Sequence, residues 1–115
     1  MKSIVTGGAG FIGSNLVDEL VRLDHEVIVI DNISTGQLSN LNKAKNKIKF
    51  INVDISNSKE SIHKYFKDVD WVFHMAGRAD IIPSITNPNS YFNSNVVGTL
   101  NILEASKKAK VKKFI

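Results

Sequence analysis

The residues with the clearest chemical potential are glycines that follow one short apolar segment. Gly7, Gly10 and Gly13 form a G-x-x-G-x-x-G pattern, and Gly8 begins an overlapping G-x-G-x-x-G pattern. Glycine at this spacing allows a tight turn after a strand, contact of the backbone with a pyrophosphate, and close packing of a helix on a sheet. The helix that follows would direct its unpaired N–H groups and its positive dipole end at the phosphates.

A carboxylate follows at the distance that a dinucleotide site requires. Asp31 lies 18 residues after Gly13, close to the ~20 residues expected before an acid that binds ribose. A carboxylate there accepts hydrogen bonds from ribose hydroxyls and would repel a 2′-phosphate. No cation follows before Lys43, so the pattern favours NAD over NADP. The alternative is a glycine-rich connection in some other βαβ protein.

The segments around these residues predict a strand, a turn, a helix and a second strand. Apolar runs at residues 4–6 and 27–30 read as buried strands. The helix between them has large apolar residues at helical spacing, namely Ile12, Leu16, Leu20 and Leu23. The other side of this helix is expected to carry Ser14, Asn15, Asp18, Glu19 and Arg22.

The remaining chain continues to alternate between strands and helices. Residues 37–47 predict a short helix or an irregular loop, and strands are expected at 48–53, 69–75 and 111–115. A helix is expected to begin at Ser58, with an apolar face formed by Ile62, Tyr65 and Phe66. This alternation predicts an α/β, doubly wound parallel sheet, a Rossmann fold, with ligands at the carboxyl ends of the strands.

The longest helix is expected after a loop at residues 78–87 that contains Pro83. Asn87 is a suitable cap and Pro88 a suitable first helical residue, and the helix should end near Ala109. One face carries Phe92, Val96, Leu100 and Leu103. Gly98 inside this helix costs about 1 kcal/mol relative to alanine. Its presence despite this cost indicates close approach of another backbone or a ligand.

Length and composition limit the possible classes. The 115 residues form at most one domain, with 43% hydrophobic residues and no cysteine, so disulfides, thiolate nucleophiles and cysteine metal sites are excluded. The sequence stops within its fifth strand, so we expect residues 1–115 to be a truncated N-terminal part. The first strand leaves no room for a signal peptide, and no apolar run approaches the ~20 residues of a membrane span. We expect a cytoplasmic protein without membrane contact.

The net charge of +4 comes from lysines clustered at residues 43–49 and 107–113. A nucleic-acid-binding patch is one interpretation. A solvated face is favoured, because no aromatic residues alternate with these lysines as single-strand binding requires. The second cluster also falls at a helix C-terminus, where cations complement the dipole.

Five ordered segments resemble the extended short-chain dehydrogenases/reductases: TGGAGFIG, DNISTG, VDI, HMAG and NVVGTLNILEAS. Within this family the chain resembles the NAD-dependent nucleotide-sugar epimerases and dehydratases, especially UDP-glucose 4-epimerase-like proteins. For an intact relative, the resemblance implies transient hydride transfer at sugar C4, with rotation of the keto-sugar before the hydride returns. It also implies a nucleotide-sugar substrate, most simply a UDP-sugar, and a homodimer or self-association through the 88–109 helix.

The resemblance implies NAD as cofactor and assigns its contacts residue by residue. The pyrophosphate would be lined by Gly7, Gly10, Phe11, Ile12 and Gly13. The adenosine ribose and its rim would be held by Asp31, Asn32, Ser34, Thr35 and Gly36. Asp54 and Ile55 would meet the adenine. The backbone under the cofactor would be Met75, Ala76 and Gly77. Asn95 would lie near the nicotinamide, and Ser84 where the family's loop approaches the sugar.

Several of these residues have structural alternatives. Asp54 could serve only to turn the chain after its strand. His74 is better explained as a strand-end histidine satisfied by hydrogen bonds than as a catalytic group, since no nucleophile or metal partner is spaced for it. Arg78 could touch a phosphate or lie in solvent. Asp80 is interpreted as a loop residue, and Asn95 could be only a polar residue of its helix.

The sequence departs from the family pattern where chemistry is concerned. The family's Ser/Thr and Tyr-x-x-x-Lys groups are not present, because Tyr65 is followed four residues later by Val69 and Tyr91 by Asn95. No catalytic residue and no metal site are therefore expected, and the fragment alone should be inactive. Some sugar epimerases carry a lysine where this chain has Ala79. The other hypotheses are a nucleotide-sugar 4,6-dehydratase, a non-catalytic dinucleotide-binding module and, ranked lower because Thr6 replaces an acid, a methyltransferase.

Overall fold

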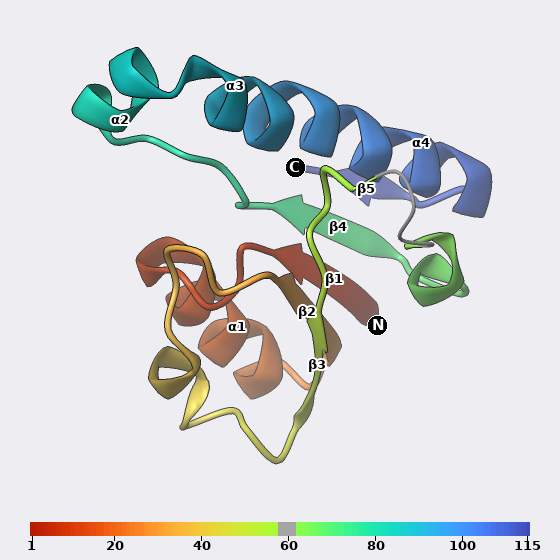
Figure 1. Cartoon of the computed structure of the whole chain (residues 1–115). Helices are drawn as coiled ribbons and strands as arrows, with labels where there is room; N and C mark the ends of the chain where they lie inside the picture. The colour runs from red at the N-terminus through yellow and green to blue at the C-terminus, as the bar shows by residue number, and fades with distance from the viewer. Residues whose placement is uncertain (58–61) are drawn as a thin grey trace.

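A five-stranded parallel sheet forms the centre of the molecule (Figure 1). The computed structural model describes residues 1–57 and 62–115. The strands are β1 (Lys2–Thr6), β2 (Glu26–Asp31), β3 (Ile48–Asn52), β4 (Trp71–His74) and β5 (Lys113–Phe114), in the spatial order β3-β2-β1-β4-β5. The chain winds outward from β1 to β3 and then crosses back to β4 and β5. This order confirms the doubly wound Rossmann fold.

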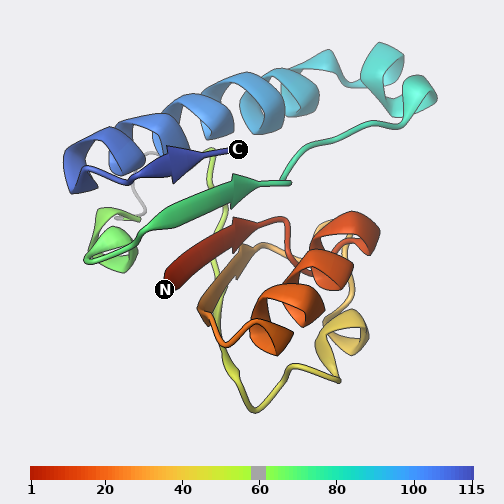
Figure 2. The same ribbon diagram turned by 180° about the vertical axis from the view of Figure 1, so that it is seen from behind.

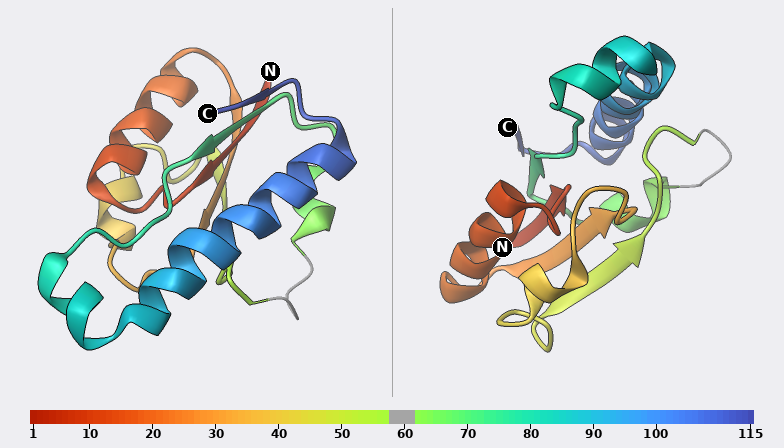
Figure 3. Two further views of the ribbon diagram at one scale, coloured as in Figure 1. Left: turned by 90° about the horizontal axis from the view of Figure 1, so that it is seen from above. Right: turned by 60° about the vertical axis from the view of Figure 1, so that its left-hand side comes forward.

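Helices cover both faces of the sheet (Figures 2 and 3). One face carries α1 (Phe11–Arg22) and the short 3-10 helix η1 (Leu38–Leu41), and the other carries α4 (Gly98–Ala109) and the 3-10 helix η2 (His63–Phe66). Alternate residues of β1 and β2 point into two separate cores. The α1 core includes Val5, Val17, Leu20, Val27 and Val29, and the α4 core includes Ile4, Ile28, Phe66, Val72 and Ile102.

The buried side of α1 differs from the expected one. Gly13, Ser14, Val17 and Leu20 face the sheet, whereas Ile12 and Leu23 are 69% and 53% exposed. The prediction was therefore wrong for Ser14, which is buried, and for both exposed residues. Gly13 explains the difference, because a Cβ there would overlap the Gly7 carbonyl oxygen. This backbone contact fixes which side of α1 faces the sheet. The spacing of the apolar side chains does not decide it.

The segment expected as a loop at 78–87 contains a short helix, α2 (Ile81–Thr86). Pro83 is compatible with it because the first N–H groups of a helix have no partner within the helix. The following helix begins as expected: α3 (Pro88–Tyr91) has Asn87 as its cap, and the Asn87 side chain accepts from the Ser90 N–H. A π-helical turn, η3 (Phe92–Val97), then joins α3 to α4.

Gly98, residues 37–47 and the segment after Ser58 agree with the sequence-based expectations to different degrees. A Cβ at Gly98 would lie 2.8 Å from Ile55 Cγ1, so the nearest approach within the chain is made by a side chain and not by another backbone. Residues 37–47 contain a short helix, η1, as expected. The start of the helix expected at Ser58 lies outside the described residues, while Ile62 and Phe66 are buried.

The described residues contain neither a membrane-spanning helix nor a cluster of metal ligands. In residues 1–57 and 62–115, no helix is both long and apolar enough to cross a membrane. In the same residues, no group of three His, Asp or Glu side chains is placed to hold a metal ion.

Candidate functional site

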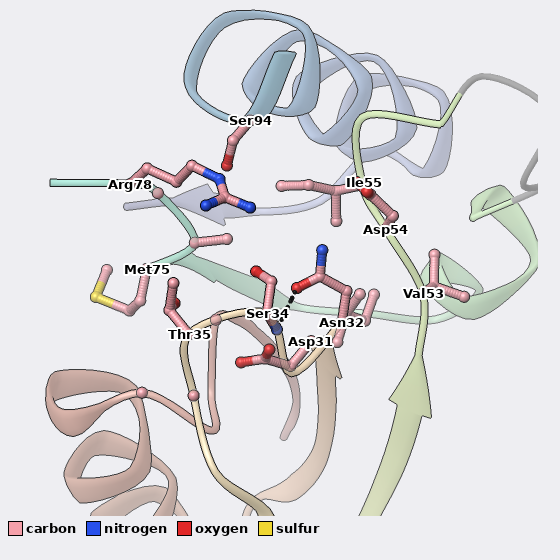
Figure 4. Close-up of a pocket in the computed structure, with 16 residues that line it drawn as sticks. Asp31, Asn32, Ser34, Thr35, Val53, Asp54, Ile55, Met75, Arg78 and Ser94 are labelled. Atoms are coloured by element: carbon pink, nitrogen blue, oxygen red, sulfur yellow. Dashed lines mark hydrogen bonds between the residues drawn. The ribbon is translucent and has the colours of Figure 1, made fainter. Parts of the chain in front are cut away.

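A cleft opens where β1, β2 and β4 end, at the carboxyl edge of the sheet (Figure 4). It encloses about 570 Å³, including its open mouth. Many of the residues expected at a dinucleotide site line it: Gly7, Gly10, Asp31, Asn32, Ser34, Thr35, Gly36, Asp54, Ile55, Met75, Ala76 and Gly77. The fold therefore brings together segments that are up to 70 residues apart in the sequence, in the crevice where open α/β sheets bind ligands.

The glycine turn after β1 is shaped by backbone contacts. Gly7 has φ +66°, and a Cβ on it would lie 2.6 Å from the Ala76 nitrogen. A Cβ on Gly13 would overlap the Gly7 carbonyl oxygen, whereas one on Gly10 would stand 3.3 Å from that oxygen. Gly7 and Gly13 are thus needed for the turn itself. Gly10 is less crowded by the protein and leaves the backbone open to the cleft.

The carboxylate of Asp31 is held by two backbone amides. Its Oδ2 accepts from the Ala9 N–H at 2.9 Å and its Oδ1 accepts from the Ile33 N–H at 2.8 Å. These bonds join the end of β2 to the glycine turn and fix the orientation of the carboxylate. Since an ionised carboxylate has about four acceptor positions, two remain for hydroxyl donors in the cleft.

Asp54 makes hydrogen bonds that turn the chain and also lines the cleft. Its Oδ1 accepts from the Ser56 N–H at 2.9 Å and from the Ser56 hydroxyl at 2.7 Å. Partial burial alone would raise the pKa of Asp54, but hydrogen bonds from Ser56 and Asn32 and the charge of Arg78 lower this pKa below its ordinary value. Asp54 is therefore held as a carboxylate acceptor, and its contact with adenine stays a prediction.

His74 at the end of β4 has both ring nitrogens hydrogen-bonded. Nδ1 lies 2.7 Å from the Thr6 hydroxyl and Nε2 lies 2.8 Å from the Thr99 hydroxyl. Burial lowers the pKa of His74, which favours the neutral ring that donates at one nitrogen and accepts at the other. This geometry is the one expected of a structural histidine.

Asn95 fastens the segment after β4 to the helix. Its Oδ1 accepts from the Arg78 N–H at 2.8 Å, and its Nδ2 donates to the Arg78 carbonyl at 2.9 Å. The Thr99 hydroxyl donates to the Asn95 carbonyl at 2.7 Å. These bonds link β1, β4 and α4 through His74 and so fix one wall of the cleft.

Over residues 3–115 the chain matches the family model described as "NAD dependent epimerase/dehydratase family". The chain belongs to this family. A UDP-glucose 4-epimerase of Mycolicibacterium smegmatis is 37% identical over 118 residues, which cover 100% of this chain and 37% of that protein. The chain thus spans little more than a third of the length of such relatives.

Solved structures from the same family superpose closely. The UDP-glucose 4-epimerase of Thermus thermophilus in complex with NAD is 38% identical with a TM-score of 0.88, covering 99% of this chain and 36% of that one. A dTDP-glucose 4,6-dehydratase of Streptomyces venezuelae, solved with NAD bound, is 30% identical with a TM-score of 0.90, covering 99% and 38%. The epimerase/dehydratase domain of this chain therefore has neighbours with two different reactions.

Some residues assigned from the family resemblance lie outside the cleft lining. Phe11 and Ile12 are exposed at the start of α1, and Gly13 packs beneath the turn. Ser84 lies on α2, where its hydroxyl donates to the Ile81 carbonyl. Asn95 acts on the cleft through Arg78. The cofactor roles of Phe11, Ile12, Gly13 and Asn95, and the sugar role of Ser84, stay predictions.

Among the polar lining residues, sequence reasoning left Arg78 undecided between a phosphate contact and solvent, and it did not name Ser94. Arg78 follows directly after the assigned residues of the fourth strand, so continuing that motif by one residue would have favoured the cleft. Ser94 is harder to find, because the π-helical turn of η3 changes which residues face the cleft. The family motif gave weight to the neighbouring Asn95 instead.

Proposed function

We propose that this chain is the NAD-binding portion of a nucleotide-sugar epimerase that resembles the UDP-glucose 4-epimerases. The observation that carries the proposal is the convergence of the Gly7 turn, the Asp31 carboxylate and the backbone of 75–77 on one cleft at the carboxyl edge of the sheet. Residues 1–115 act in this proposal as one NAD-binding Rossmann domain.

Each part of the cleft has a matching group on the dinucleotide. The open backbone at Gly10 and the amino end of α1 suit the diphosphate. Asp31 suits the adenosine ribose, with Asn32, Ser34, Thr35 and Gly36 as its rim, and Asp54 and Ile55 suit the adenine. NAD, when bound, supplies hydride acceptance and return at C4 of the sugar. The chain's own residues bind and orient it, with Met75, Ala76 and Gly77 beneath.

The 115 residues bind the cofactor in this proposal without completing the reaction. The tyrosines present are Tyr65 and Tyr91, and neither has a lysine four residues later. The Tyr91 hydroxyl is engaged, since it donates to the Asp80 carbonyl at 2.6 Å. A UDP-sugar substrate and its base would belong to the whole protein. Measurable epimerisation of UDP-glucose by these residues alone would contradict this part of the proposal.

Titration with cofactors tests the proposal directly. We expect NAD to bind more tightly than NADP, and S-adenosylmethionine not to bind, by calorimetry. Asp31→Asn should weaken NAD binding about tenfold, since it removes a charged acceptor from the ribose. Asp24→Asn is the matched control, because Asp24 is exposed and outside the cleft. Binding of S-adenosylmethionine but not NAD would replace the proposal with a methyltransferase.

A nucleotide-sugar 4,6-dehydratase is the second candidate. The similarity to the Streptomyces venezuelae dehydratase favours it, and assays of the whole protein with UDP-glucose and dTDP-glucose would separate the two. A non-catalytic dinucleotide-binding module would be favoured if the rest of the protein lacked Tyr-x-x-x-Lys. The cytoplasmic location stays a prediction that cell fractionation would test.

A further inference from the structure

Arg78 directs a cation into the cleft. Its side chain extends from the segment after β4, and its guanidinium lies between the loop that carries Asn32 and Ser34 and the helix that carries Ser94 (Figure 4). Arg78 also borders two hollows that adjoin the cleft, one next to Pro83 and Tyr91 and one next to Ser90 and Asn93. Arg78 therefore lies where the cleft joins these two hollows.

The position of Arg78 is fixed although it follows the end of a strand. Both backbone groups of Arg78 are bonded to the Asn95 side chain, at 2.8 and 2.9 Å. Asn95 is itself held in the helix by Thr99. The stem of the side chain thus starts from a defined point, which limits the entropy lost when the guanidinium binds a ligand.

The charges of the cleft leave Arg78 available for an anion. Among the described lining residues the charged side chains are Asp31, Asp54 and Arg78. In the part of the chain that the structure describes, Arg78 makes no ion pair within 4 Å, although its charge is felt at Asp54. A dinucleotide diphosphate brings two further negative charges, which two carboxylates would repel. Arg78 is the lining side chain that can offset them.

We propose that Arg78 is a diphosphate-binding residue, whose guanidinium donates to phosphate oxygens from the β4 side of the cleft while the glycine turn faces them from the β1 side. The planar guanidinium offers paired donors that match two phosphate oxygens, so arginine suits this role better than lysine. The inference rests on the proposed NAD site and adds a specific anion contact to it.

The test compares ligands that differ in phosphate content. Dissociation constants for adenosine, ADP, NAD and NADP are measured by calorimetry with the unaltered chain, Arg78→Gln and Arg78→Lys. Arg78→Gln should weaken ADP and NAD binding about tenfold or more and adenosine binding less than twofold. Arg78→Lys should recover part of the loss, and the salt dependence of NAD binding should be smaller in Arg78→Gln.

The other arginine of the chain provides the control. Arg22→Gln removes the same charge on exposed α1, where Arg22 pairs with Glu19, and should leave all four affinities unchanged. Melting curves establish that each variant is folded. Equal losses for adenosine and NAD would overturn the proposal in favour of stacking on adenine, and a loss confined to NADP would indicate a 2′-phosphate contact instead. Unchanged NAD binding by Arg78→Gln overturns this inference alone, whereas failure of the unaltered chain to bind NAD overturns the proposed function as well.

Discussion

The two walls of the cleft are held in place by different kinds of contact. The glycine wall, formed by β1, the turn at residues 7–13, α1 and β2, is closed by backbone against backbone, as at Gly13 with Gly7. The helix wall, formed by residues 74–109, is held by side-chain hydrogen bonds, as at Asn95 with Arg78 and His74 with Thr99. The two kinds of contact restrict the amino-acid sequence to different degrees.

Backbone contacts restrict residue type much more strongly than side-chain hydrogen bonds do. No side chain fits where a Cβ would overlap a neighbouring backbone, so only glycine serves at Gly7 and Gly13. A hydrogen bond such as that of Asn95 can be made by several polar residues from several positions. The glycine wall should therefore be intolerant of substitution, while the helix wall should lose stability in smaller steps.

The largest expected effect comes from Gly7→Ala. Alanine at φ +66° costs roughly 1–2 kcal/mol, and its Cβ would also press against the Ala76 backbone, which adds roughly 1–3 kcal/mol. We expect the free energy of unfolding to fall by about 3 kcal/mol, measured by urea denaturation. A loss below about 1 kcal/mol would show that the turn relaxes and would remove the contrast between the walls.

Gly10→Ala is the matched substitution on the same turn. Its Cβ would stand 3.3 Å from the Gly7 oxygen, a tight but smaller conflict. We expect stability to fall by about 1 kcal/mol or less, while NAD affinity should fall strongly because Gly10 lines the cleft, where an added methyl group would crowd a bound diphosphate. If NAD affinity were unchanged, the open backbone at Gly10 would not be the diphosphate contact.

Asn95→Ala tests the helix wall. It removes both hydrogen bonds to the Arg78 backbone, and we expect a loss of about 1–2 kcal/mol in unfolding free energy with weaker NAD binding. Asn95→Asp keeps the acceptor for the Arg78 N–H but loses the donor, so its effect should be intermediate. Asn89→Ala on α3 is the control, and an equal loss there would mean that the Asn95 bonds contribute nothing specific.

The glycine wall could be predicted from the sequence almost completely. Gly7, Gly10 and Asp31 line the cleft as expected, because their spacing reflects a backbone geometry that few other residues permit. The error on this wall concerned α1, where Ile12 was expected inside and Ser14 outside. The apolar spacing placed Ile12 on the buried side of α1 and Ser14 on the other. The contact of Gly13 with Gly7 instead decides which side of the helix faces the sheet.

The helix wall could be predicted only in outline. The Asn87 cap and the helix after it were found, but α2 was interpreted as a loop, since Pro83 suggests a break unless it lies in a first turn. The π-helical turn at Phe92–Val97 changes which residues face the cleft, so Ser94 was missed. The choice between phosphate and solvent stayed open for Arg78, because its position also depends on Asn95, which lies 17 residues further along the chain.

A pH-dependent effect on the helix wall is expected from His74. Burial lowers the pKa of His74 below its ordinary value of 6.5, so the unfolded chain binds more protons than the folded one as pH falls below about 6.5. Stability should then decrease with falling pH and level off below the folded pKa. The pKa values of Asp54 and Asp70 are also lowered, from 3.8. These carboxylates therefore change the stability only below about pH 3.8, outside the range in which His74 acts.

Melting temperatures at pH 7.5 and pH 5.5 would measure the contribution of His74. His74→Asn should be less stable at pH 7.5 and should lose much of the decrease between the two values. His63→Gln is the control, since His63 is exposed on η2. A decrease that persists unchanged in His74→Asn would assign the pH dependence to other groups.

The smallest effect on stability, and a large one on association, is expected at the outer face of the helix wall. Phe92, Val96, Leu100 and Leu103 are exposed there, as expected from the sequence, and exposed apolar rows of this kind favour association with another protein surface. We predict that the chain self-associates through this face, so Leu100→Lys should shift light-scattering masses toward the monomer while changing unfolding free energy by less than about 0.5 kcal/mol.

Leu38→Lys on η1 is a close control, since Leu38 and Leu100 are both 55% exposed but lie on opposite faces of the sheet. Equal masses for both variants would mean that the helix wall presents no association surface of its own, and that its side-chain contacts serve the cleft alone.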